Sequence, residues 1–95
     1  MPLEFEWNAR KAEANRRGHG VTFEEAATVF GDPLAAIFFD EHHSAEETRE
    51  LIIGSSDQNR LLVVSFTERG SRIRLIGARH ATKKERQNHE ENPFR

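Results

Sequence analysis

Residues 60–80, RLLVVSFTERGSRIRLIGARH, decide the fold because they contain two apolar runs joined by a short polar turn. The first run spans 60–67, and its stretch 61–66 is apolar on both faces except at Ser65, which is typical of a central strand. In the second run, 72–78, arginines alternate with aliphatic residues, which predicts a strand with one exposed face. The turn ERGS has hairpin length, so the two strands are expected to pair antiparallel.

Three further strand-like runs precede this hairpin, at 3–7, 34–40 and 49–54. The loop SSDQN, between the run at 49–54 and the hairpin, is also short enough for antiparallel neighbours. The strands from residue 34 onward are therefore expected to form an antiparallel meander.

Helices are predicted between the first two strands and at the end of the chain. The first is expected to run to about Arg17, because Gly18 and Gly20 supply a stop signal, and the second is expected to end before Gly31. Their starts are marked by capping residues: Asn8, the capping-box pair Thr22 and Glu25, and the capping-box pair Thr82 and Glu85. The predicted order is β-α-α-β-β-β-β-α, a single α+β domain over residues 1–95 with a mainly antiparallel sheet.

The composition excludes several classes of protein. The chain has 95 residues, 36% of them hydrophobic and 32% charged, and it has no apolar run near the ~20 residues that span a bilayer. Its first residues, MPLEFEWNARK, do not resemble a secretory signal. The absence of cysteine excludes disulfides, thiolate catalysis and sulfur-ligated zinc. We therefore expect a cytoplasmic protein with no membrane contact.

Charge is distributed unevenly along the chain. Residues 1–68 hold 6 Lys or Arg against 13 Asp or Glu, whereas residues 69–95 hold 8 against 3. Such asymmetry is typical of a nucleic-acid surface or of a charged partner. It is also compatible with a fold that places its basic residues late, since net charge concerns association and not fold.

Common cofactor motifs are absent from the sequence. There is no Gly-x-Ser-x-Gly elbow, no glycine-rich phosphate loop and no dinucleotide fingerprint, so no cofactor is expected. His42 and His43 lie in an acidic loop, but neighbouring residues in a loop do not define a coordination geometry, and no metal site is predicted. A small metalloprotein that uses this loop stays open as a third hypothesis.

Basic side chains gather at the ends of the predicted strands and in the last helix. They are Arg49, Arg60, Arg72, Arg74, Arg79, Lys83, Lys84 and Arg86. Arginine binds phosphate oxygens through two parallel hydrogen bonds, and lysine supplies a point charge. A ribonuclease without metal needs such cations together with a general base and a general acid. The alternative is that these residues only face water.

Several segments, in order along nearly the whole chain, resemble the BrnT family, the toxin half of a bacterial type II toxin–antitoxin pair. They are FEW at 5–7, KA at 11–12, Asn15, HGVTFEEA at 19–26, VFGDP at 29–33, HS at 43–44, Glu47, Arg49, IIG at 52–54, RLLVVSFTERGSRIRLIGAR at 60–79, AT at 81–82 and ER at 85–86. The resemblance implies a fold similar to the RelE-like ribonuclease toxins and RNA cleavage without metal that arrests translation. It also implies a partner similar to the antitoxin BrnA, often in a two-plus-two complex, which binds promoter DNA.

Candidate site residues follow from this resemblance and from the basic residues. The catalytic candidates are Arg79, His43, Arg49, Arg60 and His89. The RNA-binding candidates are Lys83, Lys84, Arg86, Lys11 and His19. Arg79 is the first choice for phosphate binding, because it ends the last strand within a family motif; the alternative is a salt bridge to a carboxylate from the acidic N-terminal part.

The chain departs from the family pattern at three positions. Gly18 and His80 stand where the family usually has lysine, and His89 replaces a tyrosine that is common in the last helix. Histidine can preserve acid–base capacity because imidazole titrates near neutral pH. The alternative function is a catalytically degenerate relative that acts as a binding module or co-repressor in an antitoxin–DNA complex.

Overall fold

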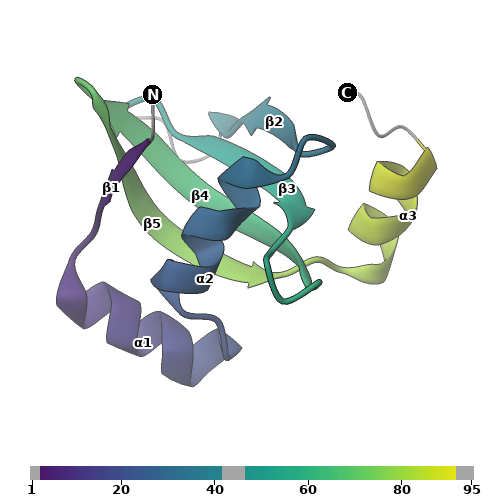
Figure 1. The fold of residues 1–95 in the computed structure, drawn as a ribbon, viewed down its shortest axis with the longest axis horizontal. Coiled ribbons are helices and arrows are strands. Elements are labelled where there is room, and N and C mark those ends of the chain that lie inside the picture. The colour runs from purple at the N-terminus through teal and green to yellow at the C-terminus, as the bar shows by residue number, and fades with distance from the viewer. Residues whose placement is uncertain (1–2, 42–46, 92–95) are drawn as a thin grey trace.

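A computed structural model describes residues 3–41 and 47–91. Its elements follow the predicted order β-α-α-β-β-β-β-α, with one short 3₁₀ helix added, which confirms the α+β prediction (Figure 1). They are β1 (Glu4–Glu6), α1 (Ala9–His19), α2 (Phe23–Thr28), η1 (Val29–Gly31), β2 (Ala36–Phe39), β3 (Glu50–Ser55), β4 (Leu61–Arg69), β5 (Arg72–His80) and α3 (Lys83–Glu91).

The strands form one sheet in the order β1-β5-β4-β3-β2. β2, β3, β4 and β5 pair antiparallel with one another in chain order, so the predicted meander and the central place of residues 60–67 are confirmed. β1 lies parallel to β5, with Glu4 opposite Arg72. This pairing joins the two ends of the chain and has no counterpart in the sequence prediction.

The predicted capping residues begin the helices. The Asn8 side chain accepts a hydrogen bond from the Lys11 amide at 3.0 Å, and the Thr22 hydroxyl accepts one from the Glu25 amide at 3.1 Å. These bonds satisfy amides that have no partner within the first helical turn. α1 continues to His19 and ends at Gly20, whose positive φ of 70° suits glycine.

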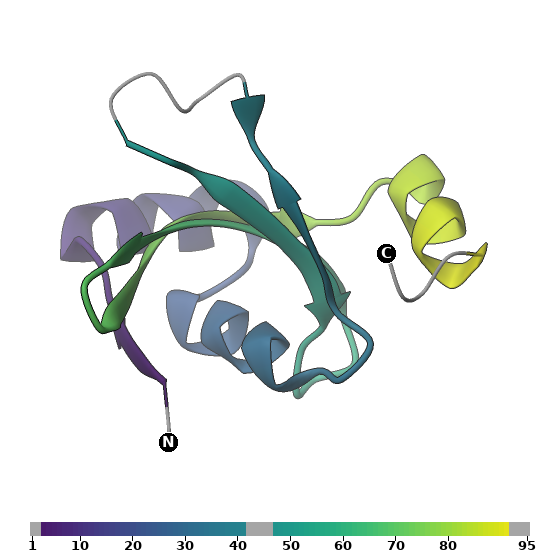
Figure 2. The ribbon, with the colours of Figure 1, turned by 90° about the horizontal axis from the view of Figure 1, so that it is seen from above.

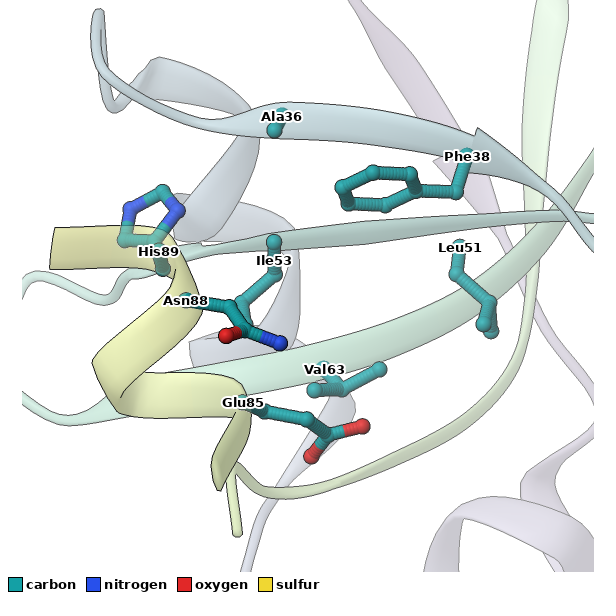
Figure 3. A pocket seen from close by; sticks show the side chains of 8 residues that line it. All are labelled: Ala36, Phe38, Leu51, Ile53, Val63, Glu85, Asn88 and His89. Atoms are coloured by element: carbon teal, nitrogen blue, oxygen red, sulfur yellow. The ribbon is translucent and has the colours of Figure 1, made fainter. Parts of the chain in front are cut away.

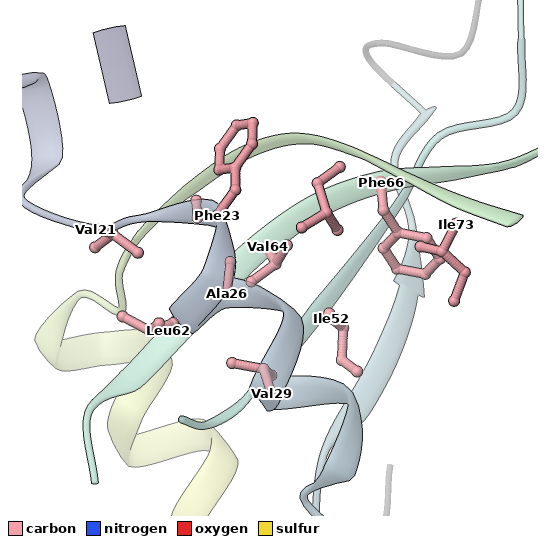
Figure 4. Packing of buried hydrophobic residues seen from close by; sticks show 11 residues of the cluster. Val21, Phe23, Ala26, Val29, Ile52, Leu62, Val64, Phe66 and Ile73 are labelled. Carbon is pink, nitrogen blue, oxygen red and sulfur yellow. The ribbon is translucent and has the colours of Figure 1, made fainter. Parts of the chain in front are cut away.

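The main hydrophobic core lies between α2 and one face of the sheet (Figure 4). Its buried residues are Val21, Phe23, Ala26, Val29, Ile52, Leu62, Val64, Phe66, Ile73, Leu75 and Ala78. A smaller cluster on the opposite face consists of Ala36, Ile53, Leu61 and Val63. Apolar residues on both faces of β4 are therefore explained, because each face contacts a cluster of its own.

β5 carries a β-bulge that reverses the direction of its later side chains. Ser65 pairs with Gly77 and Phe66 pairs with Leu75, which leaves Ile76 without a partner on β4. An extra residue in one strand shifts the alternation of faces by one position. Ala78 consequently belongs to the main core, whereas Arg79, opposite Val63, lies on the other face. We call this second face the open face.

The helices lie on different sides of the sheet. Figure 2 shows α2 beneath the sheet and α3 beyond the end of β5, away from α2. α3 buries none of its residues. Within the described part of the chain, no helix has the length and apolarity needed to cross a membrane.

Candidate functional site

Arg79 lies on the open face, near the end of β5, with 41% of its side chain exposed. Its Nη1 and Nη2 donate to the two carboxylate oxygens of Glu85, at 2.8 and 3.0 Å. Nη1 also donates to the His80 carbonyl at 3.2 Å. These contacts hold the guanidinium at the junction of β5 and α3, with its remaining N–H groups available to a ligand.

Glu85 has two roles in this arrangement. It completes the predicted capping box, because its carboxylate accepts from the Thr82 amide at 2.9 Å while its own amide donates to the Thr82 hydroxyl at 3.1 Å. The hydrogen bonds from Arg79 lower the pKa of Glu85 from 4.5 to about 2, against the opposing effect of burial. Such a weakly basic carboxylate is a poor proton acceptor at neutral pH, and its two hydrogen bonds orient Arg79.

A small cavity of about 180 Å³ brings Arg79 and His19 together. His19 is the last residue of α1, which is far from β5 in the sequence. The other lining residues are Asn15, Leu51, Val63, Ser65, Gly77 and Ala78. Two candidates that the sequence assigned to different roles, phosphate binding and RNA binding, therefore face the same space.

Asn15 fixes the position of α1 beside this cavity. Its Nδ2 donates to the carbonyls of Val21 and Ala78, both at 2.9 Å, and its Oδ1 accepts from the Ala78 amide at 3.0 Å. The side chain thus bonds the β5 backbone as a neighbouring strand would. It places the C-terminal end of α1, and with it His19, at the edge of the open face.

A larger cavity of about 420 Å³ lies between α3 and the sheet. Glu85, Asn88 and His89 line it from α3, and Figure 3 shows them facing residues of the sheet. The sheet contributes Ala36, Phe38, Leu51, Ile53 and Val63. Leu51 and Val63 line both cavities, so the two are adjacent, with His89 at the larger and His19 at the smaller.

Arg60 lies outside both cavities and contacts the start of α2. Its guanidinium forms an ion pair with the buried carboxylate of Glu25, including a bond from Nε to Oε2 at 2.8 Å. The same carboxylate accepts from the Ser56 hydroxyl at 2.6 Å, and Arg60 also donates to the Gly20 carbonyl at 3.2 Å. The bond from Arg60 lowers the pKa of Glu25, and the charge of His80 adds to this effect. These contacts join α2 to the turn before β4.

The remaining described candidates lie outside both cavities. Arg49 immediately precedes β3, lines neither cavity, and its carbonyl accepts from the Asp40 amide at 2.9 Å. Four exposed basic residues also line neither cavity. They are Lys83, Lys84 and Arg86 of α3 and Lys11 of α1.

His42 and His43 fall outside the described residues. Within 3–41 and 47–91, no three His, Asp or Glu side chains come together as metal ligands would.

Two contributors to the site were not identified as such from the sequence. Glu85 was predicted as a capping residue, and its contact with Arg79 depends on the turn between β5 and α3. Asn15 is part of the family resemblance, but nothing in the sequence indicated that it anchors α1 to β5. Both roles arise from tertiary contacts that no local pattern encodes.

Comparisons with known proteins agree with this fold. A family model described as "Ribonuclease toxin, BrnT, of type II toxin-antitoxin system" matches residues 7–85. The structure is similar to the crystal structure of the Brucella abortus ribonuclease toxin BrnT, with a TM-score of 0.67 and 22% sequence identity, over 86% of this chain and 100% of that chain. At this identity the likeness concerns the fold. No curated protein matches the sequence.

Proposed function

Because this chain belongs to the BrnT family of ribonuclease toxins of type II toxin–antitoxin systems, we propose that it is a metal-independent endoribonuclease whose cleavage of RNA inhibits translation. The active site is the open face around Arg79. The observation that carries this assignment is the small cavity that Arg79 and His19 line together. It offers a phosphate-binding fork and a group able to exchange protons within one concave space.

The reaction begins with binding of a phosphodiester by the free N–H groups of Arg79. A neutral imidazole takes the proton of the ribose 2′-hydroxyl, and the 2′-oxygen then forms a bond to phosphorus. The bond from phosphorus to the 5′-oxygen breaks as a protonated imidazole donates a proton to that oxygen. The products are a 2′,3′-cyclic phosphate and a free 5′-hydroxyl. His19 and His89, at the two adjacent cavities, supply the two imidazoles.

Arg79 contributes most at the transition state. Negative charge grows on the non-bridging phosphate oxygens as the 2′-oxygen attacks, and a fixed guanidinium stabilises that charge without reorganising. Glu85 fixes it through two hydrogen bonds. The phosphate binds the N–H groups of Arg79 that Glu85 does not use, so the contact between β5 and α3 is kept during the reaction.

The exposed cations of α3 bind the RNA backbone beyond the cleaved bond. Lys83, Lys84 and Arg86 lie in the first turns of a helix that begins directly beside Arg79. Contacts of this kind are electrostatic and independent of sequence, so RNA affinity falls steeply as salt concentration rises. Lys11, at the opposite end of α1 from His19, adds a weaker contact.

The partner is a protein antitoxin similar to BrnA, which forms a hetero-oligomer with the toxin, two copies of each in the simplest arrangement. DNA contact takes place through the antitoxin. Co-expression of the two proteins should restore growth to cells that the toxin alone arrests.

The deciding experiment measures cleavage of RNA by purified protein in the presence of EDTA. The expected products carry 2′,3′-cyclic phosphate or 3′-phosphate ends, and Arg79→Ala abolishes their formation. Arg72→Gln is the matched control, because Arg72 is an exposed arginine of the same strand whose partners are Glu4 and Glu6. Strict dependence on added metal, or equal activity of Arg79→Ala, would refute the proposed mechanism.

A catalytically degenerate binding module is the second candidate. The observation in its favour is that Glu85 already occupies one side of the Arg79 fork, which is what a purely structural ion pair requires. Induced expression without the antitoxin separates the two functions. Growth arrest supports the ribonuclease, whereas soluble protein that accumulates without arrest and still binds the antitoxin supports the binding module.

A further inference from the structure

The edge strand β2 exposes three consecutive large apolar side chains. Ile37, Phe38 and Phe39 are 52%, 47% and 56% exposed. β2 is the last strand in the sheet order, so within the described residues one side of its backbone has no neighbouring strand. An apolar edge of this kind is a template for pairing with another chain.

The three side chains point to both faces of the sheet. Phe38 lines the larger cavity on the open face (Figure 3). Ile37 is paired with the core residue Ile52 and so lies on the opposite face, as does Phe39, because side chains of a strand alternate. A helix placed in the cavity covers Phe38 alone. An added strand covers all three, because its own side chains alternate between the same two faces.

The other edge of the sheet is protected in the usual way. β1 has only three residues, and its Glu4 and Glu6 form ion pairs with Arg72 and Arg74 of β5. Short length and charged side chains are the devices that keep an edge strand from pairing. β2, Ala36–Phe39, is only one residue longer than β1, but it carries no charged side chain within its span.

We propose that β2 accepts an extended segment of the antitoxin as an additional strand of the sheet. This inference rests on the proposed function for the existence of that partner. The segment is apolar at alternate positions on both faces, where it meets Phe38 on one side and Ile37 and Phe39 on the other. Main-chain hydrogen bonds supply affinity and these side chains supply specificity.

Charge defines the ends of the segment and argues against a second copy of this chain. Asp40 and Glu41 follow β2, and Asp32 lies in the turn before it. Antiparallel pairing of two β2 strands would place the acidic end of each copy near the Asp32 turn of the other, and like charges oppose each other there. A partner with Lys or Arg beside Asp40 and Glu41 avoids this repulsion.

The location explains how such a strand could neutralise the toxin. Phe38 and His89 line the same cavity, so a strand against β2 lies at the wall of that cavity opposite α3. The antitoxin would thus meet the toxin beside the site without occupying Arg79. Neutralisation follows from closure of the space that RNA must enter.

The experiment measures binding of a purified BrnA-like antitoxin to three variants. Ile37→Lys and Phe38→Lys, on opposite faces of β2, are each expected to weaken affinity by at least about tenfold. Leu3→Lys is the matched control, because Leu3 is equally exposed, at 53%, and lies next to β1. Hydrogen exchange on the wild-type complex provides a second measurement, in which the amides of residues 36–39 gain protection.

Several outcomes would overturn the proposal. Unchanged affinity of both β2 variants, with no added protection at 36–39, rules out this edge. Loss with Phe38→Lys alone indicates a helix in the cavity. If the wild-type protein forms a homodimer and Ile37→Lys is monomeric, β2 pairs with a second copy of this chain instead of the antitoxin. RNA cleavage by Ile37→Lys is measured separately and is expected to equal that of the wild type. Cleavage without any effect on antitoxin binding would refute the docking site alone, whereas absence of cleavage by the wild type would refute the proposed function.

Discussion

Arg79 and Glu85 meet through two parallel hydrogen bonds, at 2.8 and 3.0 Å, which join the last strand to the last helix. α3 buries no residue of its own, so this ion pair, together with the capping box, holds it beside the sheet. Parallel bonds between a guanidinium and a carboxylate are stronger and more directional than a single contact. The position of α3 and the orientation of the Arg79 guanidinium therefore depend on the same contact.

Replacement of Glu85 by glutamine should lower the free energy of unfolding by about 1 kcal/mol at pH 7, a value reduced for the exposure of both partners. The pKa of Glu85 is depressed from 4.5 to about 2 in the folded protein. Its stabilising effect is therefore complete above pH 4.5 and disappears as the pH falls towards 2. Urea denaturation at several pH values checks this, with Glu90→Gln on the same helix as the control. A difference between wild type and Glu85→Gln that persists at pH 2 would contradict the assignment.

Replacement of Arg79 by lysine should reduce RNA cleavage by about 10²-fold, although the positive charge is kept. Lysine cannot form the two parallel bonds that hold Glu85, nor present a fixed fork to phosphate. Single-turnover cleavage of a short RNA measures the effect. Arg72→Lys, on the same strand, should behave as the wild type, and equal rates for both lysine variants would remove Arg79 from the site.

Replacement of His19 by asparagine should reduce cleavage by about 10²-fold or more and remove one limb of the pH–rate profile. Asparagine retains hydrogen bonding but exchanges no proton in this range. The pH dependence of kcat/KM between 5 and 9 gives the readout. His80→Asn is the control, since His80 lines neither cavity. A parallel downward shift of the whole profile would indicate that His19 has only a positioning role.

Replacement of Arg60 by alanine should destabilise the fold and leave the residues around Arg79 in place. The substitution leaves the buried Glu25 carboxylate without its charged partner. Arg69→Ala removes an exposed pair with Glu47 instead and serves as the comparison. We expect the urea midpoint to fall at least about twice as far for Arg60→Ala, because exposed pairs contribute little. Equal urea midpoints for Arg60→Ala and Arg69→Ala would show that the contacts of Glu25 with Arg60 and Ser56 contribute little to stability.

Replacement of Gly54 by alanine should cost about 1–3 kcal/mol of stability through overpacking. A Cβ atom there would lie 2.8 Å from the Ala35 Cβ and 3.1 Å from Val29 Cγ1. Gly18→Ala is the matched control, because a Cβ at Gly18 meets nothing within 4 Å. Thermal or urea unfolding of the two variants measures the contrast, and a neutral Gly54→Ala would mean that η1 moves away at no cost.

Local patterns in the sequence were sufficient to predict the elements of this fold. Alternation identified the strands, capping residues identified the helix starts, and short loops identified the meander. The parallel contact of β1 with β5 could not be predicted in this way, because it joins residues about seventy positions apart and has no local pattern.

The site was less predictable than the fold. Arg79 was identified as the leading candidate, with a carboxylate from the N-terminal part as its alternative partner, whereas its partner in the structure is Glu85. The sequence did not indicate the sheet face of Arg49 or Arg60, because a face depends on register and on bulges. His19 and Arg79 share a cavity only because Asn15 anchors α1 to β5, which is a tertiary contact.

The β-bulge at Ile76 determines the face of the sheet on which Arg79 lies. If β5 had no bulge and kept the regular alternation that places Ile73 and Leu75 in the core, Arg79 would point inward as well and Ala78 would point outward. A guanidinium in that core would have neither water nor a carboxylate, and the cavity beside His19 would lose its cation. The β-bulge therefore matters to the proposed site as much as the arginine itself, because it sets the face of the sheet on which Arg79 lies.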